Sequence, residues 1–328
     1  MDKIIGLGNA LIDVLVPIPD DKILLELQLP KGSVTYVNED NHRYINELLS
    51  QMETHQVTGG SAGNAIRAVA ELGGKSGFIG KVGKDEFGAF YRESLMKRGI
   101  VTCLLTSSTQ PSGVAVTFIT PDGERTFADH LGASAAMTAE ELTADMFSGY
   151  TYLFIEGYLV QDHDMILHAI KSAKAEGLKI CMDLSSYNII KAEHDFFSMM
   201  VNNYVDIVFA NEEEARAFTG QEPAKAARTM ATMCDIAVVK TGAAGSIICK
   251  GEEEIRIAAL PVKQIIDTTG AGDFYAAGFL YGLMNGHSLN KCGEIGSLLS
   301  AEVIQIIGTD LPDERWHTIR EEVKHIIG

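Results

Sequence analysis

Short, continuously apolar runs alternate with longer amphipathic segments along most of the chain. The apolar runs predict strands at 3–8, 76–83, 152–157, 179–184, 207–211 and 236–242. Helices are predicted between several of them, at 61–73, 85–99, 162–177 and 212–233, and residues 272–328 are predicted to be nearly all helical. Continuous apolar strands separated by helices are typical of a mostly parallel sheet covered on both faces. The pattern therefore predicts a three-layer α/β/α fold.

Two segments, 14–37 and 112–130, depart from this pattern. Their apolar and polar residues alternate, as in "SVTYV" and "GVAVTFIT", and a turn signal, "PDG", lies at 121–123. Such alternation predicts a small sheet with one face open to solvent. Because no linker-like stretch separates these segments from the rest, we predict a single domain over 1–328, with the small sheet as a lid.

Composition narrows the class of protein and of partner. The chain has 328 residues, 46% of them apolar, and a formal net charge of −17, which argues against nucleic acid and anionic membranes as partners. The apolar N-terminal stretch is interrupted by Asp2, Asn9 and Asp13, so it predicts a strand and not a signal peptide. No run approaches the ~20 apolar residues of a membrane span. The five cysteines are widely spaced, which indicates reduced thiols in a cytoplasmic protein.

The stretch "DTTGAGD" at 267–273 precedes eleven consecutive apolar or glycine residues that start at Phe274. A helix is predicted to begin near Gly270, where unpaired N–H groups and the helix dipole favour an anion. Glycines let the anion approach the backbone closely. Asp273, at the edge of this nest, could accept a proton from an alcohol while the amides stabilise a transferring phosphoryl group. An isolated Gly-Asp pair would only complement the dipole, but the full heptapeptide favours catalysis.

Two long stretches carry a family resemblance. "DTTGAGDFYAAGF" closely resembles the C-terminal signature of the ribokinase family of sugar and nucleoside kinases, also called the phosphofructokinase B family. "GGSAGNAIRAVAELGGKSGFIGKVGKDEFG" (59–88) resembles the family's N-terminal signature. The resemblance implies a ribokinase-like α/β/α fold and an ATP-dependent kinase that acts on an alcohol. It also implies that Gly270, Ala271 and Gly272 form an anion hole and that Asp273 is the general base.

Other residues match positions that the family uses for the acceptor. Asp13 lies between apolar neighbours, where a carboxylate without partners is costly, and a vicinal diol would satisfy it. The alternative is an aspartate that caps backbone. The resemblance places a substrate-binding aspartate there, with Asn9 as a weaker candidate. It assigns Gly60 and Asn64 to sugar hydroxyls, and Gly59 adds close backbone approach, although this stretch can also cap the following helix.

A further group of residues is implied for the nucleotide. "NEEE" at 211–214 has the family's spacing for Mg²⁺ and phosphate handling, with Glu214 acting through water, but Asn211 and Glu214 also fit a capping box. Arg125, on the predicted lid, matches an arginine that reaches the transferring phosphates in nucleoside kinases of the family. Nucleotide contacts are also implied for Lys240, Thr241, Gly242, Gly245, Thr268 and Thr269, although the first four also fit an ordinary turn.

Metal ions are expected to assist. Because the sequence has no Walker A lysine, Mg²⁺ is expected to neutralise the phosphates of ATP. The resemblance also implies a monovalent cation, K⁺, beside the anion hole, with Asp267, the carbonyl of Thr269 and backbone near Gly308 as candidate ligands.

Three stretches point to the acceptor. "GNALID", "FIEGYLV" (154–160) and "VIQIIGTDLP" (303–312) resemble adenosine kinases, with Tyr158 and Leu159 as walls for a purine. Several sugar kinases carry similar segments. We therefore predict phosphorylation of the 5′-hydroxyl of an adenosine-like nucleoside by a monomer or homodimer, with a ribokinase- or fructokinase-like sugar kinase as the alternative. A non-catalytic nucleotide-binding regulator is a remote alternative, against which the intact Asp273 and glycine nest argue.

Overall fold

The computed structural model describes residues 2–122 and 124–328, and its largest element is a nine-stranded sheet of order β14-β13-β12-β11-β10-β9-β1-β5-β6. In this order, all neighbouring strands from β12 through β6 pair in parallel. Strand β13 pairs antiparallel with both β12 and β14. The strands are β1 (Lys3–Leu7), β5 (Lys75–Gly83), β6 (Val101–Ser107), β9 (Tyr152–Glu156), β10 (Lys179–Asp183), β11 (Ile207–Asn211), β12 (Ile236–Lys240), β13 (Ser246–Lys250) and β14 (Glu253–Ile257).

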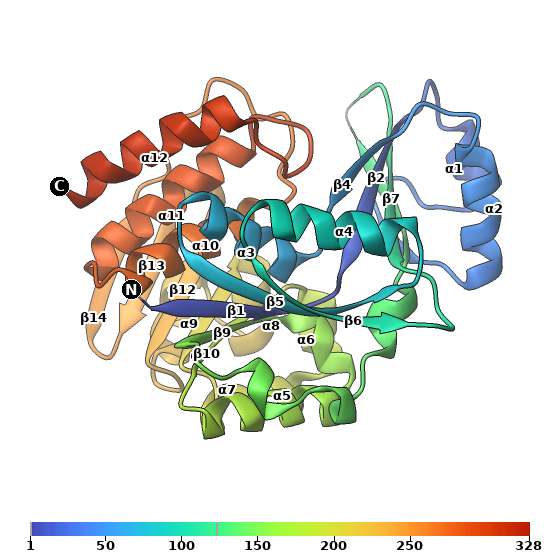
Figure 1. Ribbon diagram of the computed structural model, residues 1–328. Coiled ribbons are helices and arrows are strands. Elements are labelled where there is room, and N and C mark those ends of the chain that lie inside the picture. The colour runs from blue at the N-terminus through green and yellow to red at the C-terminus, as the bar shows by residue number, and fades with distance from the viewer. Residues whose placement is uncertain (1, 123) are drawn as a thin grey trace.

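Helices cover both faces of this sheet, each over its own hydrophobic core (Figure 1). One face is covered by α3 (Ser61–Glu71), α4 (Glu86–Lys97), α10 (Ala271–Met284), α11 (Leu289–Val303) and α12 (Asp313–Ile327). The other is covered by α5 (His163–Ala175), α6 (Tyr187–Ala192), α7 (His194–Asn203), α8 (Glu212–Thr219) and α9 (Pro223–Met230). The predicted three-layer arrangement is therefore present. In the described part of the chain, no helix combines the length and apolar character that crossing a membrane requires.

The single helix predicted at 212–233 is wrong, because the chain forms two helices there. Helix α8 ends at Thr219 and is followed by Gly220, which adopts a left-handed conformation with φ of 70°. Helix α9 then begins with Pro223 in its first turn. Glycine just after a helix and proline just inside the next one are the residues that favour such a break.

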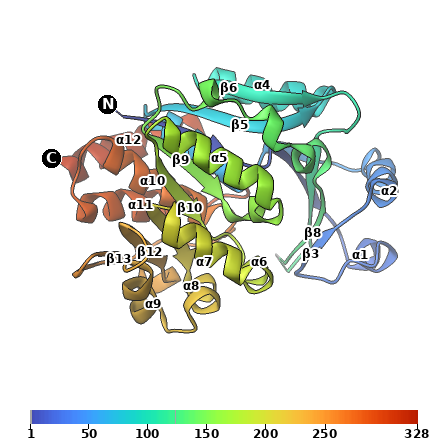
Figure 2. The ribbon, with the colours of Figure 1, turned by 90° about the horizontal axis from the view of Figure 1, so that it is seen from below.

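A second sheet of five strands, of order β3-β8-β7-β2-β4, lies beside the main domain (Figure 2). It contains β2 (Leu11–Pro17), β3 (Val34–Tyr36), β4 (His55–Thr58), β7 (Gly113–Ile119) and β8 (Arg125–His130), with helices α1 (Lys22–Glu26) and α2 (Glu39–Leu49). Strand β4 and helix α2 lie outside the predicted ranges 14–37 and 112–130. Strand β4 has only four residues, two of them exposed, so its apolar pattern is too weak to read. Gly123 of the predicted turn lies outside the described residues.

The two faces of this second sheet, called the lid sheet below, differ in what they contact. Its outer apolar side chains, such as Val14 and Val116, share a core with Ile45 of α2. Figures 1 and 2 show α1 and α2 on the side of the lid sheet that faces away from the main domain. The inner face carries Asp13 and Asp129, which line a cleft. The polar residues of the alternating strands, such as Asp13 and Asp129, therefore face the cleft.

Candidate active site

A cleft of about 2250 Å³ lies between the inner face of the lid sheet and the carboxyl ends of the parallel strands. Ligands of open α/β sheets bind at this edge. Pockets for one small molecule usually measure ~300–1,000 Å³, so this cleft can hold two substrates side by side. Most of the predicted site residues line it; Gly59, Thr241, Arg125, Asp267 and Gly308 are not part of its wall.

The N-terminus of α10 forms the floor of the cleft. Its cap, Gly270, has φ of 75°, and a Cβ there would lie 2.5 Å from Cγ2 of Thr309, so glycine is required on both counts. The amide of Ala271 donates to the carbonyl of Thr268 at 3.2 Å. The amides of Gly272 and Asp273 come next in the first turn, where helix N–H groups lack partners within the helix. These two amides are therefore the donors that the first turn of α10 can offer to an anion.

Asp273 is half-buried and held by two side chains of α3. Its Oδ1 accepts from the hydroxyl of Ser61 at 2.6 Å, and its Oδ2 accepts from the amide of Asn64 at 2.9 Å. Burial raises the pKa of Asp273 to about 6, against the opposing effect of these two hydrogen bonds. A carboxylate with this pKa is ionised at neutral pH but is a stronger base than an ordinary aspartate, which suits a general base.

Asp13 projects from β2 into the opposite side of the cleft. A Cβ at Gly59 would lie 2.2 Å from its Oδ1, so glycine at 59 makes room for this carboxylate. Gly60 has φ of 82°, and a Cβ there would lie 2.1 Å from the carbonyl oxygen of Asn9. Burial, and secondarily the nearby Asp129, raise the pKa of Asp13 to about 7. The site therefore presents a desolvated carboxyl group ready for a hydrogen-bonding ligand.

Asp129 is a cleft residue that the sequence reasoning missed. Asp13 pairs with Ala115 across β2 and β7, and Ala115 pairs with Asp129 across β7 and β8, so the three form one row on the lid sheet. Among the described residues, Oδ1 of Asp129 has no hydrogen-bond partner although it is buried. Burial raises the pKa of this carboxyl to about 7. Alternation in "RTFADH" is the signal that could have placed Arg125, Phe127 and Asp129 on one face.

Glu156, at the end of β9, is a second missed residue and is 1% exposed. Its Oε1 accepts from the backbone and side-chain N–H groups of Asn9 at 2.9 and 2.7 Å, and its Oε2 accepts from the amide of Ala62 at 2.9 Å. Burial raises its pKa to about 7. The side-chain amide nitrogen of Asn9 therefore donates to Glu156. Tyr158 also lines the cleft, and its hydroxyl donates to the carbonyl of Ser185 at 3.2 Å.

Lys240 marks the other end of the cleft. Its Nζ donates to Oδ2 of Asp183 at 2.7 Å, and a Cβ on Gly272 would lie 2.8 Å from that nitrogen, so the ammonium group lies against the anion hole. Burial opposes its charge, but Asp183 and Glu214 outweigh that effect and raise the pKa of Lys240. Asp183, at the end of β10, was missed as well. Gly242, Gly245, Thr268 and Thr269 line the same region, whereas Thr241 is buried.

Asn211 and Glu214 form the capping box that was the alternative for "NEEE". The side chain of Asn211 accepts from the amide of Glu214 at 2.9 Å, and the carboxylate of Glu214 accepts from the amide of Asn211 at 2.8 Å. Glu214 nevertheless lines the cleft, and burial, followed by the charge of Asp183, raises its pKa to about 7. Capping therefore fixes a carboxyl group at the wall of the cleft.

Arg125 and the residues predicted to hold a monovalent cation contact one another in this structure. Nη2 of Arg125 lies 2.9 Å from Oδ2 of Asp267, with the two side chains 13% and 2% exposed. Asp267 also accepts from the amides of Thr269 at 3.0 Å and Gly308 at 2.7 Å. Gly308 thus directs an N–H group at the carboxylate, and a guanidinium supplies the positive charge. The carboxylate of Asp267 is thus paired in this structure, and Arg125 contacts Asp267 and not the first turn of α10.

In the described residues, no set of three His, Cys, Asp or Glu side chains is arranged to hold a metal ion. Isolated carboxylates on the cleft wall, such as Asp183 and Glu214, are compatible with a Mg²⁺ ion that brings most of its ligands from phosphates and water.

Comparison with known proteins gives consistent matches over nearly the whole chain. A family model described as pfkB family carbohydrate kinase matches residues 32–316. The crystal structure of a probable sugar kinase from Rhizobium etli has a TM-score of 0.87 at 30% identity, covering 99% of this chain and 98% of the other. That of adenosine kinase from Sinorhizobium meliloti has a TM-score of 0.86 at 32% identity, covering 99% of both chains. An adenosine kinase from Saccharomyces cerevisiae is 27% identical over 334 residues, covering 95% of this chain and 97% of the relative.

Proposed function

The chain belongs to the pfkB family of carbohydrate kinases, and we propose that within this family it transfers the γ-phosphate of ATP to the 5′-hydroxyl of an adenosine-like nucleoside. The family makes the chain an ATP-dependent kinase of the sugar and nucleoside class. The ribokinase-like fold predicted from the sequence is confirmed by the solved structures that it matches.

The observation that carries the proposal is the position of Asp273. Its carboxylate is held by Ser61 and Asn64, in the first turn of α3 after Gly60, while the adjacent Gly272 lies against Lys240. Acceptor and phosphate donor can therefore approach Asp273 from opposite ends of one cleft. Proximity of this kind turns a bimolecular reaction into an effectively unimolecular one.

The chemistry follows from this placement. Asp273 takes the proton of the acceptor hydroxyl, whose oxygen then forms a bond to the γ-phosphorus while the bond to the β-phosphate oxygen of ATP breaks. The amides at the start of α10 stabilise the negative charge on the transferring phosphoryl group, as does the ammonium of Lys240. Mg²⁺, when bound with ATP, would neutralise phosphate charge, and Glu214, which lines the cleft, would hold it through water.

A nucleoside suits the acceptor end of the cleft better than a free sugar. Asp13 can accept from both hydroxyls of a ribose diol, and Asp129 lies further along the same row with an oxygen that has no partner in the described part of the chain. Phe127 and Tyr158 supply apolar surface on the same cleft. A base with an amino group offers a flat surface to these two side chains. Its amino group offers an N–H donor to the oxygen of Asp129. The adenosine kinase relatives agree with this choice, and the probable sugar kinase keeps a sugar as the second candidate.

The test is ADP release from Mg-ATP in the presence of single acceptors. The panel contains adenosine, inosine, ribose, fructose and glucose at equal concentrations. We expect the highest kcat/KM with adenosine. A free sugar that exceeds adenosine would replace the nucleoside proposal by the sugar-kinase alternative, and no turnover with any acceptor of either class would contradict both.

A further inference from the structure

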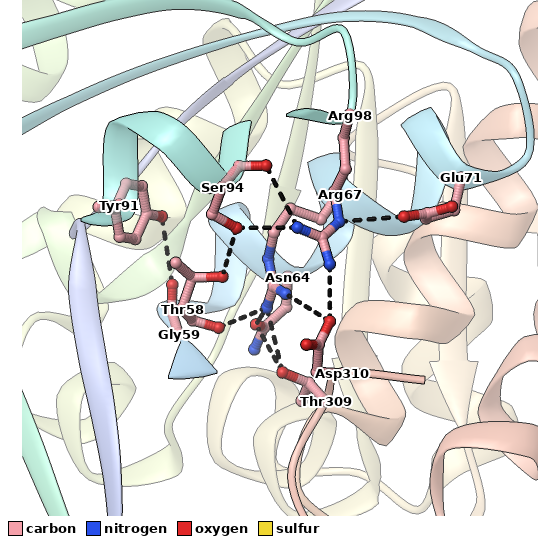
Figure 3. A network of polar contacts seen from close by, with 10 residues as sticks. All are labelled: Thr58, Gly59, Asn64, Arg67, Glu71, Tyr91, Ser94, Arg98, Thr309 and Asp310. Atoms are coloured by element: carbon pink, nitrogen blue, oxygen red, sulfur yellow. Dashed lines mark hydrogen bonds and ion pairs between the residues drawn. The ribbon is translucent and has the colours of Figure 1, made fainter. Parts of the chain in front are cut away.

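Arg67, on α3 one turn after Asn64, is an arginine with only 4% of its surface exposed. Arginine is almost never buried unless it is paired. Its Nη2 donates to the carbonyl of Thr58 and to Oδ1 of Asn64, both at 2.5 Å, and to the hydroxyl of Thr309 at 3.1 Å (Figure 3). One guanidinium thus joins the end of the lid strand β4, helix α3 and the loop before α12.

These contacts determine which way the amide of Asn64 points. Its Oδ1 accepts from Arg67 and also from the hydroxyl of Thr309 at 3.1 Å. Its Nδ2 is then left to donate to Oδ2 of Asp273 at 2.9 Å. The reversed amide would place N–H against the guanidinium and a carbonyl oxygen against the carboxylate. Two repulsive contacts would replace two attractive ones.

A second arginine supports this arrangement from outside. Arg98 lies on the turn after α4, with its Nε 3.0 Å from Oε1 of Glu71 and its Nη2 2.7 Å from Oδ1 of Asp310 (Figure 3). Its Nη1 donates to the hydroxyl of Ser94 at 2.9 Å. Asp310 in turn lies 3.9 Å from Nη1 of Arg67. Arg98 therefore shares a neighbour with Arg67, whereas its own hydrogen bonds go to residues other than Asn64.

We propose that Arg67 is a positioning residue for phosphoryl transfer, which acts by fixing the amide of Asn64 so that it donates to Asp273. The inference rests on the proposed function, because it takes Asp273 as the base. A long polar side chain within a helix normally indicates solvent exposure, so the sequence alone gives no signal for this arrangement. The buried guanidinium also ties the base to the lid through Thr58.

The test is the pH dependence of kcat in Arg67→Met at saturating ATP and acceptor. Without the guanidinium the amide of Asn64 is free to rotate, and Asp273 loses a hydrogen bond that favours its ionised form. The acidic limb of the profile should move up by about one pH unit. Looser placement of the base should also lower kcat at least about tenfold, with little change in the KM for ATP. Thr309→Val removes the second donor to Oδ1 and one acceptor of Arg67 but keeps the guanidinium, so it should move the limb in the same direction by less.

Other groups near the base are the same in wild type and variants. The titratable and charged groups that face Asp273 across the cleft are Asp13, Glu156, Tyr158, Asp183, Glu214 and Lys240. Arg98→Met is the matched control, because it removes a neighbouring positive charge and its ion pairs without touching the Asn64 amide. It should leave the acidic limb in place.

A double-mutant comparison separates positioning from general support of the fold. In an Asn64→Ala background, Arg67→Met should produce no further shift of the acidic limb. A folded Arg67→Met enzyme with a wild-type profile and kcat would overturn the inference, as would a full shift that persists without Asn64. If Arg67→Met should not fold, the same two outcomes are read from Thr309→Val. Normal turnover in Asp273→Asn would instead remove the proposed function itself.

Discussion

At the level of single residues, the acceptor end of the cleft is defined by two carboxyl groups on one row of the lid sheet, Asp13 and Asp129. Burial is the main reason that the pKa of each is raised to about 7. A buried polar atom without a partner costs free energy that a ligand hydrogen bond recovers. The two residues are therefore expected to recognise different parts of one acceptor.

This division predicts two independent specificities. Asp13→Ala should raise the acceptor KM and abolish the preference for adenosine over 2′-deoxyadenosine. Asp129→Ala should abolish the preference for adenosine over purine riboside, which lacks the amino group. Each hydrogen bond to a charged group contributes ~1.5–3 kcal/mol, so each wild-type preference should be about tenfold or more in kcat/KM.

Each variant is the control for the other, since it should keep the preference that the other loses. Equal kcat/KM of the wild type for adenosine and purine riboside would show that Asp129 does not bind the amino group. Equal values for the ribo and 2′-deoxyribo compounds would remove Asp13 from the diol.

Residues differ in how far the sequence alone could identify them. Asp273, the glycines before it and Asp13 sit in stretches long enough to resemble a known family. Glu156 and Asp183 end buried strands, as single carboxylates after apolar runs, and the rule that parallel strands end at one edge could have placed them in the cleft. Arg67 could not be found in this way, because its partners Thr58 and Thr309 lie on other elements that only the folded chain brings near.

At the level of elements, the lid sheet is attached to the α10 loop by the Arg125–Asp267 ion pair. The sequence could indicate a lid, because alternation along each strand is local. It could not indicate this contact, because the two residues are far apart in sequence and each fits another role as well. Strand β4 was missed because its four residues, two of them exposed, carry no usable pattern.

The ion pair predicts a monovalent-cation response. Because the guanidinium already stands beside Asp267, wild-type turnover should be the same in K⁺ and in tetramethylammonium. Arg125→Ala leaves a buried carboxylate unpaired, a loss that costs about 3–5 kcal/mol in buried pairs, so the lid should open and kcat should fall. Added guanidinium or K⁺ should restore part of the activity by filling the vacated position. Steady-state ADP release is measured for the wild type in K⁺ and in tetramethylammonium, and for Arg125→Ala with and without added guanidinium or K⁺.

Asp267→Asn provides the matched control, because it removes the charge that the cation would neutralise. Combined with Arg125→Ala, it should make the enzyme insensitive to guanidinium and K⁺. Several-fold stimulation of the wild type by K⁺ over tetramethylammonium would contradict the ion-pair interpretation and restore the predicted cation site.

At the level of the whole molecule, the cleft concentrates carboxyl groups in a chain whose net charge is already −17. Burial is the leading cause that raises the pKa values of Asp13, Asp129, Glu156 and Glu214 to about 7, from ordinary values of 3.8 for Asp and 4.5 for Glu. Between about pH 4 and 7 the folded chain therefore holds protons that the unfolded chain has released. Stability from these groups is present at low pH and is lost as pH rises through about 7.

The ligand-free protein should accordingly melt at a higher temperature near pH 5.5 than near pH 8, by about 2 °C or more. Asp129→Asn removes one of the four groups and should weaken this dependence. Differential scanning calorimetry of both proteins in matched ionic strength gives the comparison. A melting temperature that rises between these two pH values would show that the cleft carboxyl groups do not govern stability in this range.

The central claim is that Asp273 removes the proton from the acceptor hydroxyl at the N-terminus of α10. Asp273→Asn keeps the size of the side chain but removes its basicity. Measured as ADP release from saturating Mg-ATP and adenosine, its kcat should fall by roughly 10²–10⁴, while the dissociation constant for ATP from calorimetry should stay close to that of the wild type. Near-normal turnover of the folded Asp273→Asn enzyme would contradict the account.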